Sequence, residues 1–331
     1  MSTIRAAAPL LVIDNLQVGF RKSGGVLPVI NAANLSLRRD EAVGVVGESG
    51  SGKTMLCRSL IGTLARHGAT VTGGQIRFNG RELAGAPESV WRQVRGREIG
   101  YVPQSSLAGL NPVLTVRTQM LEAIGAAQAL QGSAAEQEAL RLLDLVRIPR
   151  AQAVLGERSH QLSGGMRQRI MIAATLAQKP NLLVADEPTT ALDVTVQKEI
   201  LSLIGRLRRE LGMALILVSH DLAVIEEVCD SVMVMYAGAT VEAGPVAAIV
   251  GAPRHAYTRA LRLSRVDTAL RGQLLETIGG EPPTIGAWPQ GCRFWPRCPL
   301  GDEQCRQGGQ PPLRQVGPQW SACIYAERVS P

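Results

Sequence analysis

The amino-acid sequence predicts an α/β protein with a largely parallel core sheet. Short apolar runs alternate with segments of helical periodicity, which is the pattern of strands joined by crossover helices. The runs are continuously apolar, as expected of strands that are covered on both faces. A glycine-rich turn separates the first run from the helical segment after it. The predicted core strands are AVGVVG at 42–47, LLVAD at 182–186, ALILVS at 214–219 and VMVMY at 232–236.

The segments around these strands predict smaller parts of the fold. Residues 10–39 alternate with Gly and Pro and predict an antiparallel sheet at the edge of the core. Residues 54–66, TMLCRSLIGTLAR, carry leucines at helical spacing and predict one packed helix. Residues 112–178 are poor in β-branched runs and predict a helical insertion. From residue 251 onward Pro, Gly, Trp and Cys increase, so we expect a domain at 1–250 and a C-terminal extension at 251–331.

Composition restricts the class of protein more than the net charge does. The 331 residues are 45% hydrophobic and 19% charged, which is typical of a folded chain with one large or two medium domains. The net charge of +7 comes from scattered arginines, and nucleic acid, anionic lipid or a solvated face explains it equally well. The N-terminus shows no signal-peptide pattern. The most apolar long segment, residues 231–250, includes Glu242 and Pro245, so we do not expect it to span a membrane. We therefore expect a soluble, cytosolic protein without disulfides.

A phosphate-binding loop is predicted at Gly47 to Thr54, GESGSGKT, which fits G-x-x-x-x-G-K-[ST] between a strand and a helix. Glycines let backbone N–H groups surround phosphates, and the helix N-terminus adds partial positive charge. Lys53 is expected to reach the β- and γ-phosphates, and Thr54 to offer its hydroxyl to Mg²⁺. The predicted phosphate-binding residues are Gly47, Ser49, Gly50, Ser51, Gly52, Lys53 and Thr54.

An acidic pair ends the second core strand. In LLVADEP, Asp186 closes the apolar run and Glu187 follows it. An acid at such a strand end can hold Mg²⁺, directly or through water, and the next acid can orient or deprotonate a water that attacks the γ-phosphate. Two solvated acids are the plainer alternative. Together with the phosphate loop, the pair predicts a nucleoside triphosphate hydrolase.

The segment QLSGGMRQR at 161–169 predicts a second anion site. Ser163, Gly164 and Gly165 open a helix whose N–H groups and serine hydroxyl can bind phosphate, although a simple glycine turn fits the same residues. LSGG followed by basic residues, and then by the Asp-Glu strand, resembles the ATP-binding-cassette (ABC) ATPases. Met166 stands where the commonest pattern of that family has glutamine, but LSGGMRQR is familiar in its peptide-importer branch.

The resemblance covers residues 10–250 and extends to the other motifs of that family. Gln104 resembles the Q-loop glutamine that senses Mg²⁺, Asp193 resembles the D-loop aspartate, and His220 resembles the switch histidine at the γ-phosphate. Phe20 is the candidate for the aromatic ring that stacks on adenine, and an ordinary packed ring fits it equally. The resemblance implies a P-loop ABC ATPase with a RecA-like core, an antiparallel β edge subdomain and a helical subdomain.

The same resemblance implies roles for the motif residues. Glu187 would activate water, and His220 and Lys53 would stabilise charge on the γ-phosphate. The residues expected to contact Mg²⁺ are Thr54, Gln104 and Asp186. Each ATP would lie between the phosphate loop of one cassette and the LSGG helix of a second ABC ATPase subunit, which would be a copy of this chain or a paralogue.

Several stretches resemble the dipeptide/oligopeptide importer subfamily, which includes nickel importers. They are GLNPVLTV at 109–116, EPTTALDVTVQ at 187–197, RHAYTRAL at 254–261 and the tail GCRFWPRCP. HPYTRAL is usual in the third, so Ala256 predicts a local change in the turn.

This likeness implies an ATP-hydrolysing subunit that powers uptake of peptides or similar small solutes. It would lie on the cytoplasmic face of the inner or plasma membrane, bound to two transmembrane permease subunits that serve an extracytoplasmic solute-binding protein. The alternative is a soluble ABC ATPase without a role in transport. The sequence shows no basic surface interleaved with aromatic residues, so we do not expect nucleic acid as a partner.

Four of the six cysteines lie in the tail, with the spacing C-x5-C-x6-C-x17-C. They are Cys292, Cys298, Cys305 and Cys323. The spacing lacks the C-x2-4-C pair that is usual in structural zinc sites. Four thiolates are the usual ligands of a [4Fe–4S] cluster, and some members of the resembled subfamily look as if they carry iron–sulfur here. We therefore expect a [4Fe–4S] cluster, with zinc or unligated cysteines as alternatives. Cys57 and Cys229 are expected to be packing residues.

Overall fold

The computed structural model describes residues 8–105, 109–264 and 277–329. Contacts divide the chain into two compact units, of which the first contains residues 1–86 and 217–331 and the second contains residues 87–216. The first seven residues of the predicted domain 1–250 lie outside the described residues, as do 106–108. The same holds for residues 265–276 and 330–331 of the predicted extension. No helix in the described ranges is long and apolar enough to cross a membrane.

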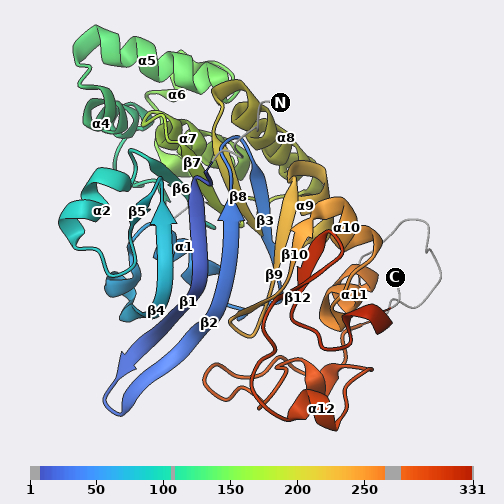
Figure 1. Ribbon diagram of the computed structural model, residues 1–331. Helices are drawn as coiled ribbons and strands as arrows, with labels where there is room; N and C mark the ends of the chain where they lie inside the picture. The colour runs from blue at the N-terminus through green and yellow to red at the C-terminus, as the bar shows by residue number, and fades with distance from the viewer. Residues whose placement is uncertain (1–7, 106–108, 265–276, 330–331) are drawn as a thin grey trace, which may run out of the picture. The chain divides into compact units, whose positions relative to one another are not determined.

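An antiparallel sheet forms the N-terminal part of the first unit. Its strands, in the order β2-β1-β4-β5, are β2 (Gly25–Leu37), β1 (Leu11–Lys22), β4 (Ala69–Phe78) and β5 (Arg81–Glu82). β1 and β2 form a hairpin that pairs Leu11 with Leu37 and Lys22 with Gly25. The three long strands lie side by side in Figure 1. The antiparallel sheet predicted for residues 10–39 is therefore confirmed.

A second sheet of the first unit joins the phosphate-loop strand to the C-terminal tail. The strands of this sheet from β11 to β3 follow the order β11-β12-β10-β9-β3, and the bounds are β11 (Arg314–Val316), β12 (Gln319–Ser321), β10 (Ala239–Pro245), β9 (Ser231–Tyr236) and β3 (Ala42–Val46). β3 and β9 are parallel, and all five residues of β3 are buried. β10 is antiparallel to both β9 and β12, so β12 lies beside β10 (Figure 1). Burial explains why β3 and, after Ser231, β9 are continuously apolar.

The helices of the first unit are short. They are α1 (Lys53–Leu60), α9 (Leu222–Val228), α10 (Val246–Gly251), α11 (Ala256–Leu263) and α12 (Glu303–Arg306), with the 3₁₀ turns η1 (Leu64–His67), η4 (Trp295–Arg297) and η5 (Ala326–Arg328). The single helix predicted over residues 54–66 is wrong at its end, because α1 stops at Leu60. Gly62 follows with φ of 64°, a left-handed conformation that ends the helix.

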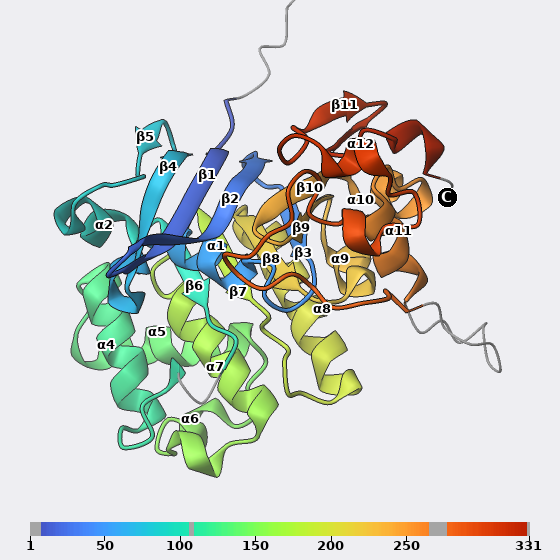
Figure 2. The same cartoon turned by 90° about the horizontal axis from the view of Figure 1, so that it is seen from below.

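The second unit is mainly helical. Its helices are α2 (Glu88–Val94), α4 (Val116–Gln128), α5 (Gly132–Leu145), α6 (Ala151–Val154), α7 (Gly164–Leu176) and α8 (Val194–Leu211), with the 3₁₀ turn η2 (Ser159–Gln161). Helices α4 to α7 gather together in Figure 2. The unit also contains the parallel strands β6 (Ile99–Val102) and β7 (Leu182–Asp186). Strand β8 (Ala214–Ser219) contains the boundary between the two units, and β7 and β8 have the bounds predicted from the sequence.

Candidate functional site

The predicted phosphate loop follows β3 directly and leads into α1. Gly52, at the N-cap of α1, has φ of 103°, which residues with a side chain rarely adopt. At Gly47 an added Cβ would come within 2.2 Å of the Met235 carbonyl oxygen. The loop therefore has its shape only because glycine occupies these positions.

Lys53 begins α1 and turns back over the loop. Its ammonium donates hydrogen bonds to the carbonyl oxygens of Gly47 at 2.7 Å and of Glu48 at 3.1 Å. Ser49 and Gly50 are exposed, Thr54 is half-buried, and the buried Ser51 hydroxyl has no hydrogen-bond partner among the described residues. A cation, an unsatisfied hydroxyl and a helix N-terminus that converge on one loop fit a phosphate group.

Two other predicted residues belong to the same unit. His220 is exposed and follows β8, and the next residue, Asp221, accepts the Ala223 N–H at 2.8 Å as the cap of α9. Phe20 is half-buried on β1, where it pairs with Leu27 of β2 and with Ala69 of β4. A half-buried ring at this position fits both adenine stacking and ordinary packing.

The acidic pair lies in the second unit, at the end of β7. Asp186 is 1% exposed and accepts a hydrogen bond from the Tyr101 hydroxyl at 3.2 Å. The Glu187 carboxylate accepts the side-chain N–H of Gln104 at 2.8 Å and the Thr190 hydroxyl at 3.0 Å. Glu187 also has φ of 45°, a left-handed conformation that is unusual for a residue with a side chain. The structure thus brings Gln104, predicted from a separate motif, to the acid that the sequence nominates as the base.

The LSGG segment opens α7 as predicted. Ser163 is the N-cap, and its hydroxyl accepts the Met166 N–H at 3.2 Å. Asp193 caps α8 in the same way by accepting the Val196 N–H at 3.0 Å. Gly164 and Gly165 lie against Leu192 and Val196, because added Cβ atoms there would meet these side chains at 3.1 and 2.7 Å. Within the second unit, the LSGG segment and the predicted D-loop are therefore neighbours, and Ser163 and Asp193 are exposed.

The four tail cysteines carry no disulfide; Cys292 and Cys305 are buried, and Cys298 and Cys323 are half-buried. Burial raises the pKa of Cys292 to about 11 and that of Cys323 to about 12, and the charges of the neighbouring thiols add to both shifts. Among the described residues, no group of three or more His, Cys, Asp or Glu side chains is arranged to hold a metal ion. The geometry therefore gives no support to the predicted [4Fe–4S] cluster or to its zinc alternative. Cys57 and Cys229 are both buried in the first unit, as predicted.

Sequence motifs assigned no contact to Glu48 of the phosphate loop or to the two residues that bind it. The Glu48 carboxylate pairs with Arg297 of the tail at 2.7 Å, and its backbone N–H donates to the Tyr257 hydroxyl at 2.7 Å. Tyr257 and Arg297 lie in RHAYTRAL and GCRFWPRCP, two stretches that pointed to a subfamily but not to a contact. The sequence shows only that Arg297 precedes Cys298, and this does not identify Glu48 as the partner of the arginine.

Comparison with known families finds two regions of this chain. Residues 30–190 match the ABC transporter family, and residues 241–305 match the oligopeptide/dipeptide transporter C-terminal region. A relative from Brucella abortus is 44% identical over 316 residues, which are 96% of this chain and 95% of the relative. The oligopeptide transport ATP-binding protein OppD of Escherichia coli is 41% identical over 94% of this chain and 91% of its own length.

Solved structures share the fold at lower identity. A dimeric ATP-binding cassette in a post-hydrolysis state with ADP and Pi aligns at 24% identity with a TM-score of 0.63, over 71% of this chain and 98% of that one. The cbiO1 protein of Clostridium perfringens, part of the ABC transporter complex cbiONQ, aligns with the same identity and TM-score over 74% of this chain and 91% of its own. These two likenesses concern the fold alone.

Proposed function

The chain belongs to the ATP-binding proteins of ABC transporters that carry the oligopeptide/dipeptide transporter C-terminal region, and we propose that it hydrolyses ATP to power peptide uptake. The observation that carries this proposal is 41% identity to an oligopeptide transport ATP-binding protein over 94% of this chain, with the phosphate loop and the acidic pair both in place. A soluble ABC ATPase without transport is disfavoured by the match of residues 241–305 to a transporter-specific region.

The residues of the two units take distinct roles toward ATP. We propose that the loop from Gly47 to Thr54 binds the phosphates through its N–H groups and that Lys53 exchanges its bonds to the loop carbonyls for bonds to phosphate oxygens. The Mg²⁺ that accompanies ATP would neutralise phosphate charge, and the residues proposed to hold it are Thr54, Gln104 and Asp186. Phe20 is proposed to contact adenine.

Glu187 is proposed to accept a proton from the attacking water. Its carboxylate is held by Gln104 and Thr190, so its direction is fixed before water arrives. His220 and Lys53 would stabilise charge on the γ-phosphate. The exposed residues Ser163 and Asp193, with Gly164 and Gly165, are proposed to face the nucleotide of a second cassette.

The proposed assembly follows from this role. The chain works with a second ATPase subunit, a copy or a paralogue, and with two permease subunits served by an extracytoplasmic solute-binding protein. It is placed on the cytoplasmic face of the membrane through the permeases. The predicted boundary between a cassette at 1–250 and an extension at 251–331 is kept as a proposal.

The test of hydrolysis is Glu187→Gln in the assembled transporter. The amide keeps the shape of the side chain but cannot take a proton, so turnover should fall by about 10²-fold or more while ATP binding persists. The control is Glu210→Gln, which removes a carboxylate from an exposed ion pair with Arg206 on α8. Turnover that survives Glu187→Gln would exclude Glu187 as the base, whereas loss of nucleotide binding would point to a structural role.

We also propose that the four tail cysteines bind a metal centre, a [4Fe–4S] cluster first and zinc as the alternative. The support is the donor set itself, because all four tail cysteines are free of disulfides and four thiolates are the usual ligands of such a cluster. Binding requires the thiols to come closer than they lie in this structure. About four irons and four sulfides per anaerobically purified chain would establish the cluster. One zinc per chain without sulfide would establish the alternative. A chain that contains neither iron nor zinc would overturn the proposal.

A further inference from the structure

The cysteine-containing tail reaches the phosphate loop through Arg297, the residue before Cys298. The Arg297 guanidinium binds both carboxylate oxygens of Glu48, with Nη1 to Oε2 at 2.7 Å and Nη2 to Oε1 at 3.0 Å. The Arg297 side chain is 5% exposed, and hydrogen bonds to Glu48 raise its pKa. A two-pronged, largely buried pair of this kind fixes direction as well as distance.

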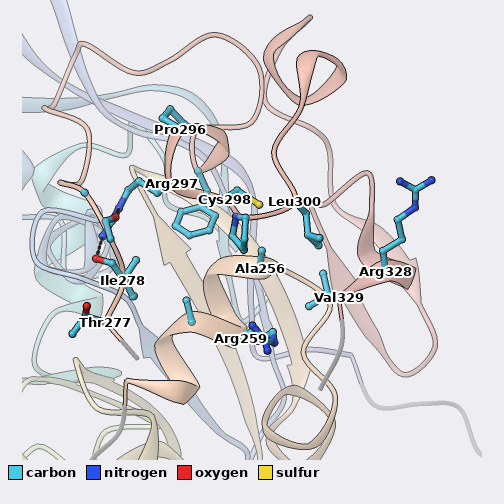
Figure 3. Close-up of a pocket in the computed structure, with 15 residues that line it drawn as sticks. Ala256, Arg259, Thr277, Ile278, Pro296, Arg297, Cys298, Leu300, Arg328 and Val329 are labelled. Atoms are coloured by element: carbon cyan, nitrogen blue, oxygen red, sulfur yellow. Dashed lines mark hydrogen bonds between the residues drawn. The ribbon is translucent and has the colours of Figure 1, made fainter. Parts of the chain in front are cut away.

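The other donors of Arg297 are also used. Nε donates to the Gly279 carbonyl at 2.8 Å, Nη2 to the Ile278 carbonyl at 3.2 Å, and Nη1 to the Tyr236 hydroxyl at 3.2 Å. Figure 3 shows Arg297 beside Ile278 and Cys298, at the wall of a cavity of about 700 Å³. These contacts hold the Arg297 side chain in place independently of its pairing with Glu48.

The backbone of Glu48 is held as well as its side chain. Its N–H donates to the Tyr257 hydroxyl at 2.7 Å. The ring of Tyr257 packs on Tyr236 with centroids 4.6 Å apart and on Phe294 of the tail at 5.4 Å. Since all three rings are at most 1% exposed, the hydroxyl that receives the loop N–H is fixed by tight packing.

A second arginine makes a parallel link. Arg293 directly follows Cys292, stacks on the Trp288 ring at 3.8 Å and donates to the Ala237 carbonyl. The next residue, Gly238, donates its N–H to the Ser51 carbonyl of the phosphate loop at 3.0 Å. Two residues that each adjoin a tail cysteine therefore contact the loop or the turn that supports it.

We infer that the tail braces the phosphate loop and that Arg297 is a positioning residue for nucleotide binding. The brace acts where it matters, because the Gly47 and Glu48 carbonyls that bind Lys53 flank the Glu48 N–H held by Tyr257. A loop held in one shape before binding loses less conformational freedom when phosphate arrives. By thermodynamic reciprocity, nucleotide binding must then stabilise the segment 292–298.

The first test measures the affinity of the full-length chain for a fluorescent MgADP analogue. Arg297→Gln should weaken binding by about tenfold, and Glu48→Gln combined with Arg297→Gln should be no weaker than either single variant. Arg297→Lys should recover only part of the loss, because lysine cannot make the two-pronged contact. The control is Arg306→Gln, which also alters an arginine beside a tail cysteine but one that is paired only with exposed Glu303 at 3.8 Å.

The second test keeps the inference falsifiable if a variant folds poorly. Hydrogen exchange of the unmodified chain should slow at residues 292–298 on MgADP binding, while residues 303–316 should change little. The inference rests on the proposed nucleotide binding at this loop, so an unmodified chain that binds no MgADP would overturn both the proposed function and the brace. A chain that binds normally, with equal affinity in Arg297→Gln and no exchange difference at 292–298, would overturn the brace alone.

Discussion

At Gly165 the second glycine of the LSGG segment leaves no room for a side chain. An alanine Cβ would lie 2.7 Å from Val196 Cγ1, so Gly165→Ala must displace the start of α7 against α8. We expect turnover of the assembled transporter to fall by about tenfold or more, since a small misplacement of a phosphate-binding group is costly. MgADP binding by the chain alone should persist, because the phosphate loop belongs to the other unit.

The matched variants separate sterics from other causes. Adding Val196→Ala to Gly165→Ala should restore much of the turnover, because it removes the methyl group that clashes. Gly125→Ala on α4, where nothing but a carbonyl at 3.9 Å lies near the new Cβ, should leave turnover unchanged. A loss that Val196→Ala does not relieve would mean that Gly165 is needed for a contact with a partner.

Single residues were predictable from the sequence where a local motif names them. Glu187 and Gln104 were each placed by their own motif, and their 2.8 Å contact was then a consequence of the fold. Arg297 and Glu48 are 249 positions apart, and neither periodicity nor spacing links them. The tail arginines could not be assigned because their partners are set by tertiary packing.

At the scale of elements, one buried carboxyl ties β10, α11 and β12 together. Glu242 is fully buried and accepts hydrogen bonds from the Arg254 N–H, from the His255 N–H at 3.0 Å and from the Gln319 amide at 2.9 Å. Burial raises the pKa of Glu242 to about 7 and lowers that of His255 to about 4. The other ionisable groups near the carboxyl are Arg254, whose charge lowers the Glu242 pKa, and His255, whose lowered pKa keeps it neutral near pH 7.

This carboxyl predicts a pH-dependent stability. Between pH 4.5 and about 7 the folded chain holds a proton on Glu242 that the unfolded chain has lost, so Glu242 makes the free energy of unfolding fall as pH rises through this window. His255 acts in the opposite direction between about pH 4 and 6.5, because its folded pKa is lowered to about 4, so the net loss should be below about 1 kcal/mol. Urea unfolding at pH 5 and pH 8 measures it, and Glu242→Gln should remove the falling contribution, so that the stability of the variant is lower at both pH values but rises with pH. An unchanged slope in that variant would assign the effect to other groups.

The N-terminus of α11 predicts a stabilising substitution. Ala256 is the first residue of the helix, and His255 before it has the extended conformation, φ −127° and ψ 132°, that a residue before proline adopts. Ala256→Pro should therefore raise the free energy of unfolding by about 0.5 kcal/mol, through a less flexible unfolded chain. Thermal unfolding checks this. Ala260→Pro, inside the same helix, should instead cost about 3 kcal/mol or more.

Secondary-structure elements were predictable from the sequence where burial along the whole element produces a continuously apolar run. The bounds of β7 and β8 follow from continuous apolar runs, because both strands are buried along their whole length. The helix after the phosphate loop was overextended, since the leucine spacing continues past Gly62 while the backbone does not. The short strands β11 and β12 were missed, because three residues are too few to show a period.

At the scale of the whole molecule, the tail and the cassette share one hydrophobic core. Phe294 of the tail is 1% exposed and packs on Tyr236 of β9 and on Tyr257 of α11. Phe294→Ala should lower the free energy of unfolding by about 3–5 kcal/mol. Ile324→Ala, at a tail residue that is 40% exposed, should cost less than about 1 kcal/mol. Equal small losses in denaturant titrations would show that the tail unfolds independently.

The division of the chain was only partly predictable. Composition marks a change near residue 251, yet residues on both sides of that position belong to the same compact unit. The predicted motifs are distributed over both units, with the phosphate loop and His220 in the first and Gln104, Glu187 and the LSGG segment in the second. The sequence gives the order of the motifs along the chain, but it does not show which motifs belong to the same compact unit.

The β11–β12 hairpin has a consequence for solubility at high concentration. Without it, the part of β10 at Glu242 and Ala243, which pairs with Ser321 and Trp320 of β12, would present N–H and C=O groups to which another chain could add a strand. The hairpin moves that exposed margin to β11, which is only three residues long and whose Arg314 pairs with Glu327 at 2.7 Å. Because so short and charged a margin is a poor template, we expect the hairpin to lower the tendency of this edge to add a strand from another chain.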